Sequence, residues 1–356
     1  MKTALPVLGF LSLAAAALPE WNSYPGHSPA VENRTLDEIY AVAKKEGGSL
    51  VVLWGGDAVS QGKSTIDAWK ARFPDIELNL TVDVSKYHDS RVNRQFQRTG
   101  TDGADIAVLQ TVHDYVRWKR EGRLYPYKPA HWEDVWAAIR DPDGAFSITD
   151  RFGSLIYNPA LLKEANVPST YDEFLRPEWK GKLVLTYPND DDAVLYLFSI
   201  IINQYGWEWF EALLKQDVKW VRGTGEPAAE ISQRNSTRSL SFTTSPQGSL
   251  VSKDPKDTFV YWPQTGAIFA STSRPESAKL FMSWLLSDDY QKNFNRSYLA
   301  RKDLSSTAGS IWDDSSTPLT QFSTFMENRE VVEWWKLQFE TSIGTAQGVI
   351  SLLYDN

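Results

Sequence analysis

Short apolar strands that alternate with helices are the feature that most constrains the fold of this chain. LVVLW at residues 50–54 is typical of a buried strand, and a helix is expected over about residues 64–73. The alternating run IELNLTVDV at 76–84 predicts a second strand, and ADIAVLQ at 104–110 predicts a third after a helix near 89–100. This order predicts a mostly parallel sheet with helices on both faces.

The same alternation starts again after the loop RDPDGAF. A strand is expected at 153–158, a capped helix and turn at 170–182, and a buried strand leading into an apolar helix at 183–206. Later, FVYWPQTGAIFAS at 259–271 predicts one long strand, and an amphipathic helix is expected over 274–294. A chain of 356 residues is long enough for two such units, each with its own core.

The loop after the first strand resembles a nucleotide-binding loop but fails at one position. A P-loop needs a glycine, four residues, and then Gly-Lys-Ser/Thr, because that first glycine lets backbone N–H groups wrap the phosphates. Counting back from Gly62 and Lys63 places Asp57 at this position. A carboxylate there would repel a triphosphate. The loop between a strand and a helix start remains a suitable place for another small ligand.

Composition and the N-terminus predict a secreted globular protein. The formal net charge of −8 argues against nucleic-acid binding. MKTALPVLGFLSLAAAA, residues 1–17, is typical of a signal peptide and is too short to span a bilayer, so no membrane insertion is expected. Residues 18–34 form an irregular leader. With no cysteine, the chain also lacks a lipid-anchored Cys. We therefore expect a free extracellular protein.

Four N-glycosylation sequons suit a eukaryotic secretory route. The acceptor residues are Asn33, Asn79, Asn235 and Asn295.

Several stretches of the chain resemble a known family. GSLIYNPALLKEANVPSTYDEFLRPEWKGKLVL resembles the middle of extracellular solute-binding proteins of ABC transporters, of the ferric iron, thiamine and polyamine class. LTYPNDDDAVLY, WVRG and WPQTGAIF are similar to the same pattern. The resemblance spans roughly residues 35–300, and the secretion signals suggest a eukaryotic, fungal-type secreted member.

This resemblance implies an α/β fold of the periplasmic-binding-protein type 2 class. Two lobes, each a mixed, mostly parallel sheet flanked by helices, would be joined by a hinge of two crossing strands. Lobe 1 would take residues 35–145 plus 271–356, and lobe 2 residues 146–270 with the crossing strands near 146–158 and 259–270. The solute would lie in the cleft between them.

Candidate ligand-binding residues are those after strands and at helix starts, where backbone N–H groups lack partners. In lobe 1 they are Trp54, Gly55, Gly56, Asp57, Lys86, Tyr87, His88, Asp89, Gln110 and Thr111. In lobe 2 and on the return crossing they are Tyr187, Asn189, Asp190, Thr243, Thr244, Ser245, Trp262 and Gln264. Each candidate also has a purely structural alternative: the aspartates at 190–192 can cap a helix, the tryptophans can fill the core, and Thr243 to Ser245 can form a plain turn.

Neither a metal nor a cofactor is expected in the cleft. Ferric-binding relatives present adjacent tyrosines in the second lobe, and no such pair occurs here; Tyr87, His88 and Asp57 are the only alternative metal ligands considered. Aromatic and carboxylate side chains suit an organic cation or polar metabolite, whereas Lys86 and Arg222 leave an anion open.

The sequence leaves three candidate functions. The first is a non-catalytic, monomeric protein that captures a small polar or charged solute by hinge closure and has a permease or receptor as a possible partner. The second is a secreted interaction protein that kept the fold and lost the solute. The third is a secreted hydrolase, but no G-x-S-x-G elbow, cysteine nucleophile or zinc-protease helix supports it.

Overall fold

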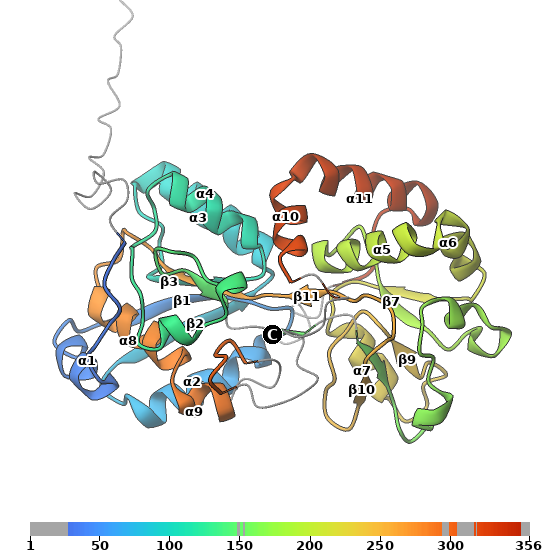
Figure 1. Cartoon of the computed structure of the whole chain (residues 1–356), viewed down its shortest axis with the longest axis horizontal. Helices are drawn as coiled ribbons and strands as arrows, with labels where there is room; N and C mark the ends of the chain where they lie inside the picture. The colour runs from blue at the N-terminus through green and yellow to red at the C-terminus, as the bar shows by residue number, and fades with distance from the viewer. Residues whose placement is uncertain are drawn as a thin grey trace, which may run out of the picture.

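The computed structural model describes residues 28–147, 150–151, 154–293, 299–304, 317 and 319–349. These residues form two α/β lobes that lie side by side (Figure 1). The predicted signal peptide, most of the leader, Asn295 and residues 350–356 lie outside the described residues. Within the described part of the chain, no helix has the length and apolar character needed to cross a membrane.

Lobe 1 is built on one five-stranded sheet, in the order β2-β1-β3-β12-β4. Its strands are β1 (Ser49–Gly55), β2 (Glu77–Asp83), β3 (Ile106–Leu109), β4 (Phe146–Ser147) and β12 (Thr265–Ile268). Its helices are α1 (Leu36–Ala43), α2 (Lys63–Arg72), α3 (Ser85–Thr99), α4 (Val112–Arg120), α8 (Pro275–Leu285) and α9 (Asp288–Asn293), with short 3-10 turns at Val59–Gly62, Trp132–Asp134 and Ala137–Ile139.

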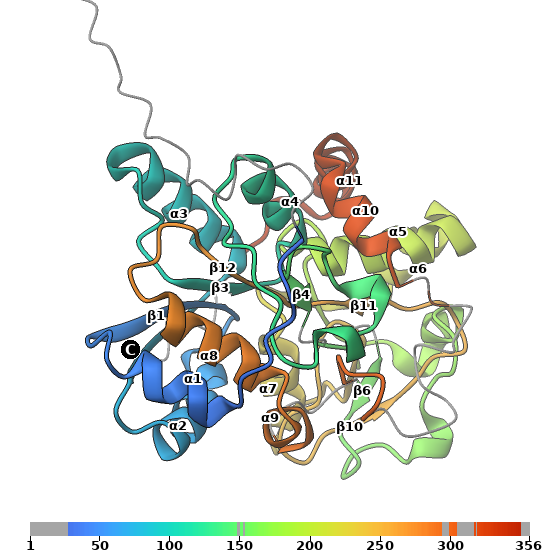
Figure 2. The same ribbon diagram turned by 60° about the vertical axis from the view of Figure 1, so that its left-hand side comes forward.

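Strand β1 is buried on both faces, which explains its continuous apolar sequence. It pairs in parallel with β2 and with β3, as the strand–helix order predicts. Leu50 and Val52 pack in one core with residues of α1, α2 and α8, whereas Val51 and Leu53 pack on the other face against residues of α3 and α4. Figures 1 and 2 show these two helical layers on either side of the sheet.

Lobe 2 holds shorter strands between one large core and a smaller one. Its strands are β6 (Leu155–Tyr157), β7 (Val184–Thr186), β8 (Lys219–Val221), β9 (Leu240–Ser241) and β10 (Val251–Lys253). Its helices are α5 (Asp192–Tyr205), α6 (Trp207–Leu214), α7 (Glu226–Ser232), α10 (Gln321–Glu327) and α11 (Arg329–Ile343), with 3-10 turns at Glu164–Asn166, Asp172–Leu175 and Pro177–Trp179. Strands β7 and β8 are parallel, but β6 pairs antiparallel with both β9 and β10, so this lobe is less parallel than expected.

Two pairs of strands lie where the chain passes between the lobes. β5 (Asp150–Arg151) pairs antiparallel with β11 (Tyr261–Trp262), and β4 pairs antiparallel with β12. The outgoing and returning segments therefore lie next to each other. Backbone pairing joins these two segments, and the chain passes between the lobes once more between α9 of lobe 1 and α10.

Three predicted elements are wrong in detail. The helix expected at 170–182 forms only two 3-10 turns, because Pro177 lacks an N–H group and disfavours helical backbone at the residue before it. The long strand at 259–271 is split into β11 and β12 on either side of Pro263 and Gln264. The helix expected over 274–294 is split into α8 and α9.

Of the segment 271–356, which is predicted to pack on lobe 1, α8 and α9 do so, whereas α11 packs on lobe 2 and α10 lies between α4 of lobe 1 and α5 of lobe 2. Phe322 of α10 and Phe339 of α11 lie fully within the core of lobe 2. The ring of Phe339 packs edge-on against Phe210 with centroids 5.1 Å apart, and Trp335 stacks on Trp207 at 5.7 Å. Aromatic residues on one face of α11 thus match an aromatic surface that lobe 2 presents.

Replacing Phe339 with Ala should destabilise lobe 2 by about 3–5 kcal/mol, because the change leaves a cavity among rings that are fully buried. Urea unfolding followed by tryptophan fluorescence measures the loss. Leu337→Ala on the same helix is the matched control, since Leu337 is 58% exposed and its loss should change the free energy by less than about 0.5 kcal/mol. Equal effects of the two variants would contradict the packing of α11 on lobe 2.

Candidate functional site

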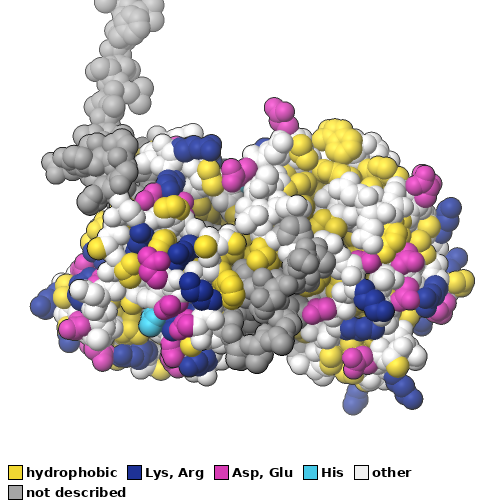
Figure 3. All heavy atoms as spheres, viewed as in Figure 1, with side chains coloured by type: hydrophobic (Ala, Val, Ile, Leu, Met, Phe, Trp, Pro, Cys, Tyr) yellow, Lys and Arg dark blue, Asp and Glu magenta, His cyan; other side chains and the backbone are white. Residues whose placement is uncertain are grey.

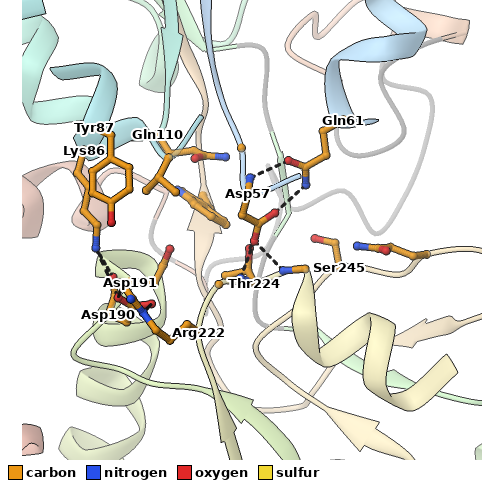
Figure 4. A pocket seen from close by; sticks show the side chains of 16 residues that line it. Asp57, Gln61, Lys86, Tyr87, Gln110, Asp190, Asp191, Arg222, Thr224 and Ser245 are labelled. Carbon is orange, nitrogen blue, oxygen red and sulfur yellow. Dashed lines mark hydrogen bonds and ion pairs between the residues drawn. The ribbon is translucent and has the colours of Figure 1, made fainter. Parts of the chain in front are cut away.

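A cavity of about 90 Å³ lies between the two lobes (Figure 4). Lobe 1 contributes Gly56, Asp57, Gln61, Val84, Lys86, Tyr87 and Gln110 to its wall. Lobe 2 contributes Asp190, Asp191, Arg222, Gly223, Thr224, Gly225, Ser245 and Gln247, and β11 contributes Trp262. One small space is therefore lined by both lobes and by the returning connection.

The topology of lobe 1 brings its lining residues together. Gly56 and Asp57 follow β1, Lys86 and Tyr87 lie in the first turn of α3 after β2, and Gln110 follows β3. The carboxyl ends of parallel neighbouring strands meet at one edge of a sheet, which is the usual place for a ligand in open α/β sheets. In lobe 2, residues 222–225 follow β8 in the same way.

Asp57 reaches across the cleft to the opposite lobe (Figure 4). Its Oδ2 accepts hydrogen bonds from Thr224 N at 2.6 Å, Thr224 Oγ1 at 2.9 Å and Gly225 N at 2.7 Å. Within its own lobe, its Oδ1 accepts a hydrogen bond from Gln61 Nε2 at 3.0 Å. A Cβ at position 225 would lie 3.2 Å from Asp57 Oδ1, so glycine allows this close approach.

Asp190 holds two cations at the other side of the cavity. Arg222 donates to both of its carboxylate oxygens, from Nη2 at 2.8 Å and from Nε at 3.1 Å. This pairing raises the pKa of Arg222 above its ordinary value. Lys86 comes from lobe 1 and donates from Nζ to the carbonyl oxygen of Asp190 at 2.8 Å. The carboxylate of Asp190 thus fixes Arg222, and its backbone carbonyl binds Lys86.

Asp191 caps helix α5 and faces the same cavity. Its Oδ1 accepts from the backbone N–H groups of Ala193 at 2.9 Å and Val194 at 3.0 Å, which confirms the capping role considered for this run of aspartates. Burial raises the pKa of Asp191 to about 6, because desolvation disfavours the charged carboxylate more than the two N–H groups stabilise it. The cavity is therefore bordered by three acidic and two basic side chains.

Neutral polar groups complete the wall. Gln110 uses its Oε1 to accept from Ser85 Oγ at 3.0 Å, while its amide points into the cavity (Figure 4). Ser245 lies on the side opposite Tyr87, and Gln247 also lines the cavity. Hydroxyl and amide groups in such positions can donate to or accept from a polar solute.

The structure brings together only part of the predicted set. Gly56, Asp57, Lys86, Tyr87, Gln110, Asp190, Arg222, Ser245 and Trp262 line the cavity. Trp54 lies in the first core and His88 is fully buried, with its Nε2 3.2 Å from Trp54 O, and burial lowers the pKa of this histidine. These two residues were selected for their position after strands, but their side chains turn inward.

The remaining predicted residues also lie outside the cavity wall. Thr111 is buried at the start of α4, Tyr187 packs on Trp220, and Asn189 donates to Gly344 O. Thr244 donates to Thr224 O, Thr243 Oγ1 accepts from Thr186 N at 2.8 Å, and Gln264 donates to Gly55 O and Val108 O. Gly55 and Asp89 are not among the lining residues, and Asp89 instead pairs with Arg117. These side chains support the backbone around the site.

Six lining residues are not predicted from the sequence: Gln61, Val84, Gly223, Thr224, Gly225 and Gln247. Asp191, expected only as a possible helix cap, also lines the cavity. Thr224 and Gly225 follow β8 and precede α7, so the rule used for the other strand ends would have found them. Gln61 and Gln247 carry no such signal, because they reach the cavity through loop geometry.

Across the described residues, no group of three or more His, Cys, Asp or Glu side chains is placed to hold a metal ion. His88 is turned toward Trp54 O, so the alternative ligand set of Tyr87, His88 and Asp57 does not converge on one point. Asp57 is also engaged by four hydrogen-bond donors. The geometry of these residues fits polar hydrogen bonding better than metal coordination.

Comparison with known proteins places the chain in a family. Residues 102–310, more than half of the chain, match the family of bacterial extracellular solute-binding proteins. The chain belongs to this family. Iron uptake protein A1 of Synechocystis sp. is 25% identical over 168 residues, which cover 46% of this chain and 44% of that protein. The matched region thus spans less than half of this relative.

Solved structures share the fold at low sequence identity. Iron-bound HitA from Pseudomonas aeruginosa is 17% identical with a TM-score of 0.60, covering 82% of this chain and 99% of that one. AfuA from Actinobacillus pleuropneumoniae, with bound fructose-6-phosphate, is 13% identical with a TM-score of 0.64, covering 83% and 100%. The fold is therefore that of the type 2 periplasmic binding proteins.

The raised pKa of Asp191 predicts a specific pH dependence. The folded protein holds the proton of the Asp191 carboxyl group more tightly than the unfolded chain does. The stability that comes from this tighter proton binding is therefore complete below the unfolded pKa and is lost as pH rises through about 6. Asp191→Asn keeps the cap without ionising. Relative to wild type, this variant should gain up to about 3 kcal/mol in unfolding free energy between pH 4 and pH 7.

Urea unfolding at a series of pH values measures this gain. Asp67→Asn, on the exposed face of α2, is the control and should shift little across the range. A pH profile of Asp191→Asn that runs parallel to wild type would show that Asp191 ionises at an ordinary pH.

Proposed function

We propose that this protein captures one small polar solute in the cavity between its lobes and that the lobes close over it. The observation that carries the proposal is the shared wall: strand-end residues of both lobes and Trp262 of the connection meet around one space. A solute that contacts both walls favours the closed arrangement, because it binds that arrangement more tightly than the open one.

The solute proposed is a compact polar metabolite or organic ion. The wall offers charges of both signs, an aromatic side chain at Tyr87 and another at Trp262, and neutral amide and hydroxyl groups. The relatives named above differ in their solutes, since one structure holds iron and another a sugar phosphate. The cavity wall, with its mixed charges, supports a zwitterionic or polar organic solute better than bare iron.

The setting proposed is extracellular. The apolar N-terminal run with its alanines supports a cleaved signal peptide and secretion. Asn33, Asn79 and Asn235 are exposed, which supports glycosylation on a eukaryotic, fungal-type secretory route. We propose a monomeric, non-catalytic protein that delivers its solute to a membrane permease or a receptor.

A second candidate function rests on the contacts that already cross the cleft. Asp57 and Lys86 of lobe 1 bond directly to groups of lobe 2. Side chains that fill part of the cleft favour a protein that kept the fold and gave up the solute, for example a secreted interaction protein. This candidate predicts that no small molecule accompanies the protein.

Native mass spectrometry of the protein as secreted should reveal one co-purified small molecule per chain. Ser245→Trp should abolish this occupancy, because an indole fills much of a cavity of about 90 Å³. Ser249→Trp is the matched control: Ser249 is exposed, follows four residues later in the same loop, and is not part of the cavity wall.

Two results would count against the proposal. Retention of the molecule by Ser245→Trp would place the solute elsewhere on the protein. No bound molecule in wild type, together with no thermal shift across a broad metabolite library, would favour the interaction protein.

A further inference from the structure

Two interlobe bridges enclose the cavity, and we infer that they latch the cleft shut in the absence of solute. Asp57 forms one bridge, to the Thr224–Gly225 segment, and Lys86 forms the other, to Asp190. This inference rests on the proposed function, because it concerns how the same cleft opens. It assigns to Asp57 the role of a lobe-closing group of the protein itself.

The Asp57 bridge is the stronger of the two. One carboxylate oxygen takes three donors from the opposite lobe, at 2.6, 2.7 and 2.9 Å, and two of these donors are backbone N–H groups with fixed positions. Hydrogen bonds to an ionised acceptor are shorter and stronger than neutral ones. Asp57 is 7% exposed, so little water competes with these donors. A rigid, dry, charge-assisted contact of this kind favours one relative position of the lobes.

Gln61 of lobe 1 orients Asp57 toward the Thr224–Gly225 segment of lobe 2. Gln61, in the turn before α2, donates from Nε2 to Asp57 Oδ1 at 3.0 Å and accepts from Asp57 N through Oε1 at 2.9 Å. This reciprocal pair fixes both the backbone and the carboxylate plane. The side chain therefore meets the opposite lobe without the loss of rotamer freedom that a mobile surface carboxylate would suffer.

The Lys86 bridge closes the other side of the cavity. Its ammonium donates to the backbone carbonyl of Asp190 at 2.8 Å and lies 3.6 Å from the carboxylate, which Arg222 holds in place from the same lobe. Lys86 is about half exposed, so this contact is screened by water and contributes less than the Asp57 bridge. Asp57 is thus the group whose removal should release the lobes.

The latch has a direct consequence for solute capture. A solute-free cleft that is already closed admits solute only during transient opening, and its apparent affinity depends on the fraction of open, binding-competent molecules. Breaking the Asp57 bridge should raise that fraction. Hydrogen bonds to charged groups are strong enough for the open-to-closed ratio to rise about tenfold or more when all three interlobe donors lose their acceptor.

The absence of cysteine makes the test straightforward, because two introduced thiols can be labelled without background. Ser64→Cys on α2 and Gln233→Cys after α7 place one spin label on each lobe at exposed positions. Distances between the labels are measured by double electron–electron resonance in protein freed of any solute by unfolding, dialysis and refolding. Wild type should give a single short-distance population.

Asp57→Ala in this background should add a longer-distance population, with the open-to-closed ratio raised about tenfold or more. Thr224→Val removes one donor from the other lobe and should give a smaller shift in the same direction. Asp67→Asn, a carboxylate change on α2 that touches nothing in lobe 2, should leave the distances unchanged. Circular dichroism and thermal unfolding verify that each variant is folded.

Identical distance distributions for wild type, Asp57→Ala and Thr224→Val would overturn the latch. A long-distance population already dominant in solute-free wild type would overturn it as well. Both results concern the free protein, so they are independent of whether a solute is found. Failure of the proposed function appears instead as the absence of any bound molecule in native mass spectrometry.

Discussion

The paired-strand connection between the two lobes is the constraint on which the rest of this structure depends. The outgoing strands β4 and β5 pair with the returning strands β12 and β11, so the chain crosses between lobes through paired backbone. On one side lies the core around β1, and on the other the aromatic core around α5 and α11. Because each lobe packs most of its apolar side chains in its own core, the lobes can meet along a polar surface around the cavity. A cavity can exist there without exposing either core.

Chain direction then decides which residues reach that surface. Parallel strands of lobe 1 all end at the edge that faces lobe 2, and each is followed by a polar loop or a helix start. The wall that results is rich in groups that hydrogen-bond, and its charges are held by partners within the protein: Arg222 on Asp190, and Asp57 on Thr224 and Gly225. Fixed charges of this kind are preorganised, and a solute that complements them need not reorder the site. The same contacts also hold the lobes together.

Family membership defines the fold and the kind of function, while the site defines the solute. Structures with the same fold hold iron in one case and a sugar phosphate in another. In the present chain the strand-end position after β1 is an aspartate that bonds to the opposite lobe, and the neighbouring histidine, His88, is buried against Trp54 O. Two residues that could have formed a metal site are therefore committed to structural contacts. Val331, Trp334 and Leu337 of α11 are exposed and are not part of the cavity wall, and Figure 3 shows apolar side chains gathered over this helix.

The sequence by itself determined the strand–helix order and the parallel pairing of β1 with β2 and β3, and it allowed an aspartate cap on α5, which Asp191 provides. These features depend on hydrophobic periodicity and on local hydrogen bonds, both of which involve residues close together in the sequence. Only the tertiary structure decided that α11 packs on lobe 2 and α10 between α4 and α5, that Trp54 and His88 turn inward, and that Gln61, Thr224 and Gly225 surround Asp57. Each of these outcomes depends on contacts between segments far apart in the chain. A position after a strand places a residue near the cleft, but the packing of the opposite lobe decides whether its side chain reaches the cavity.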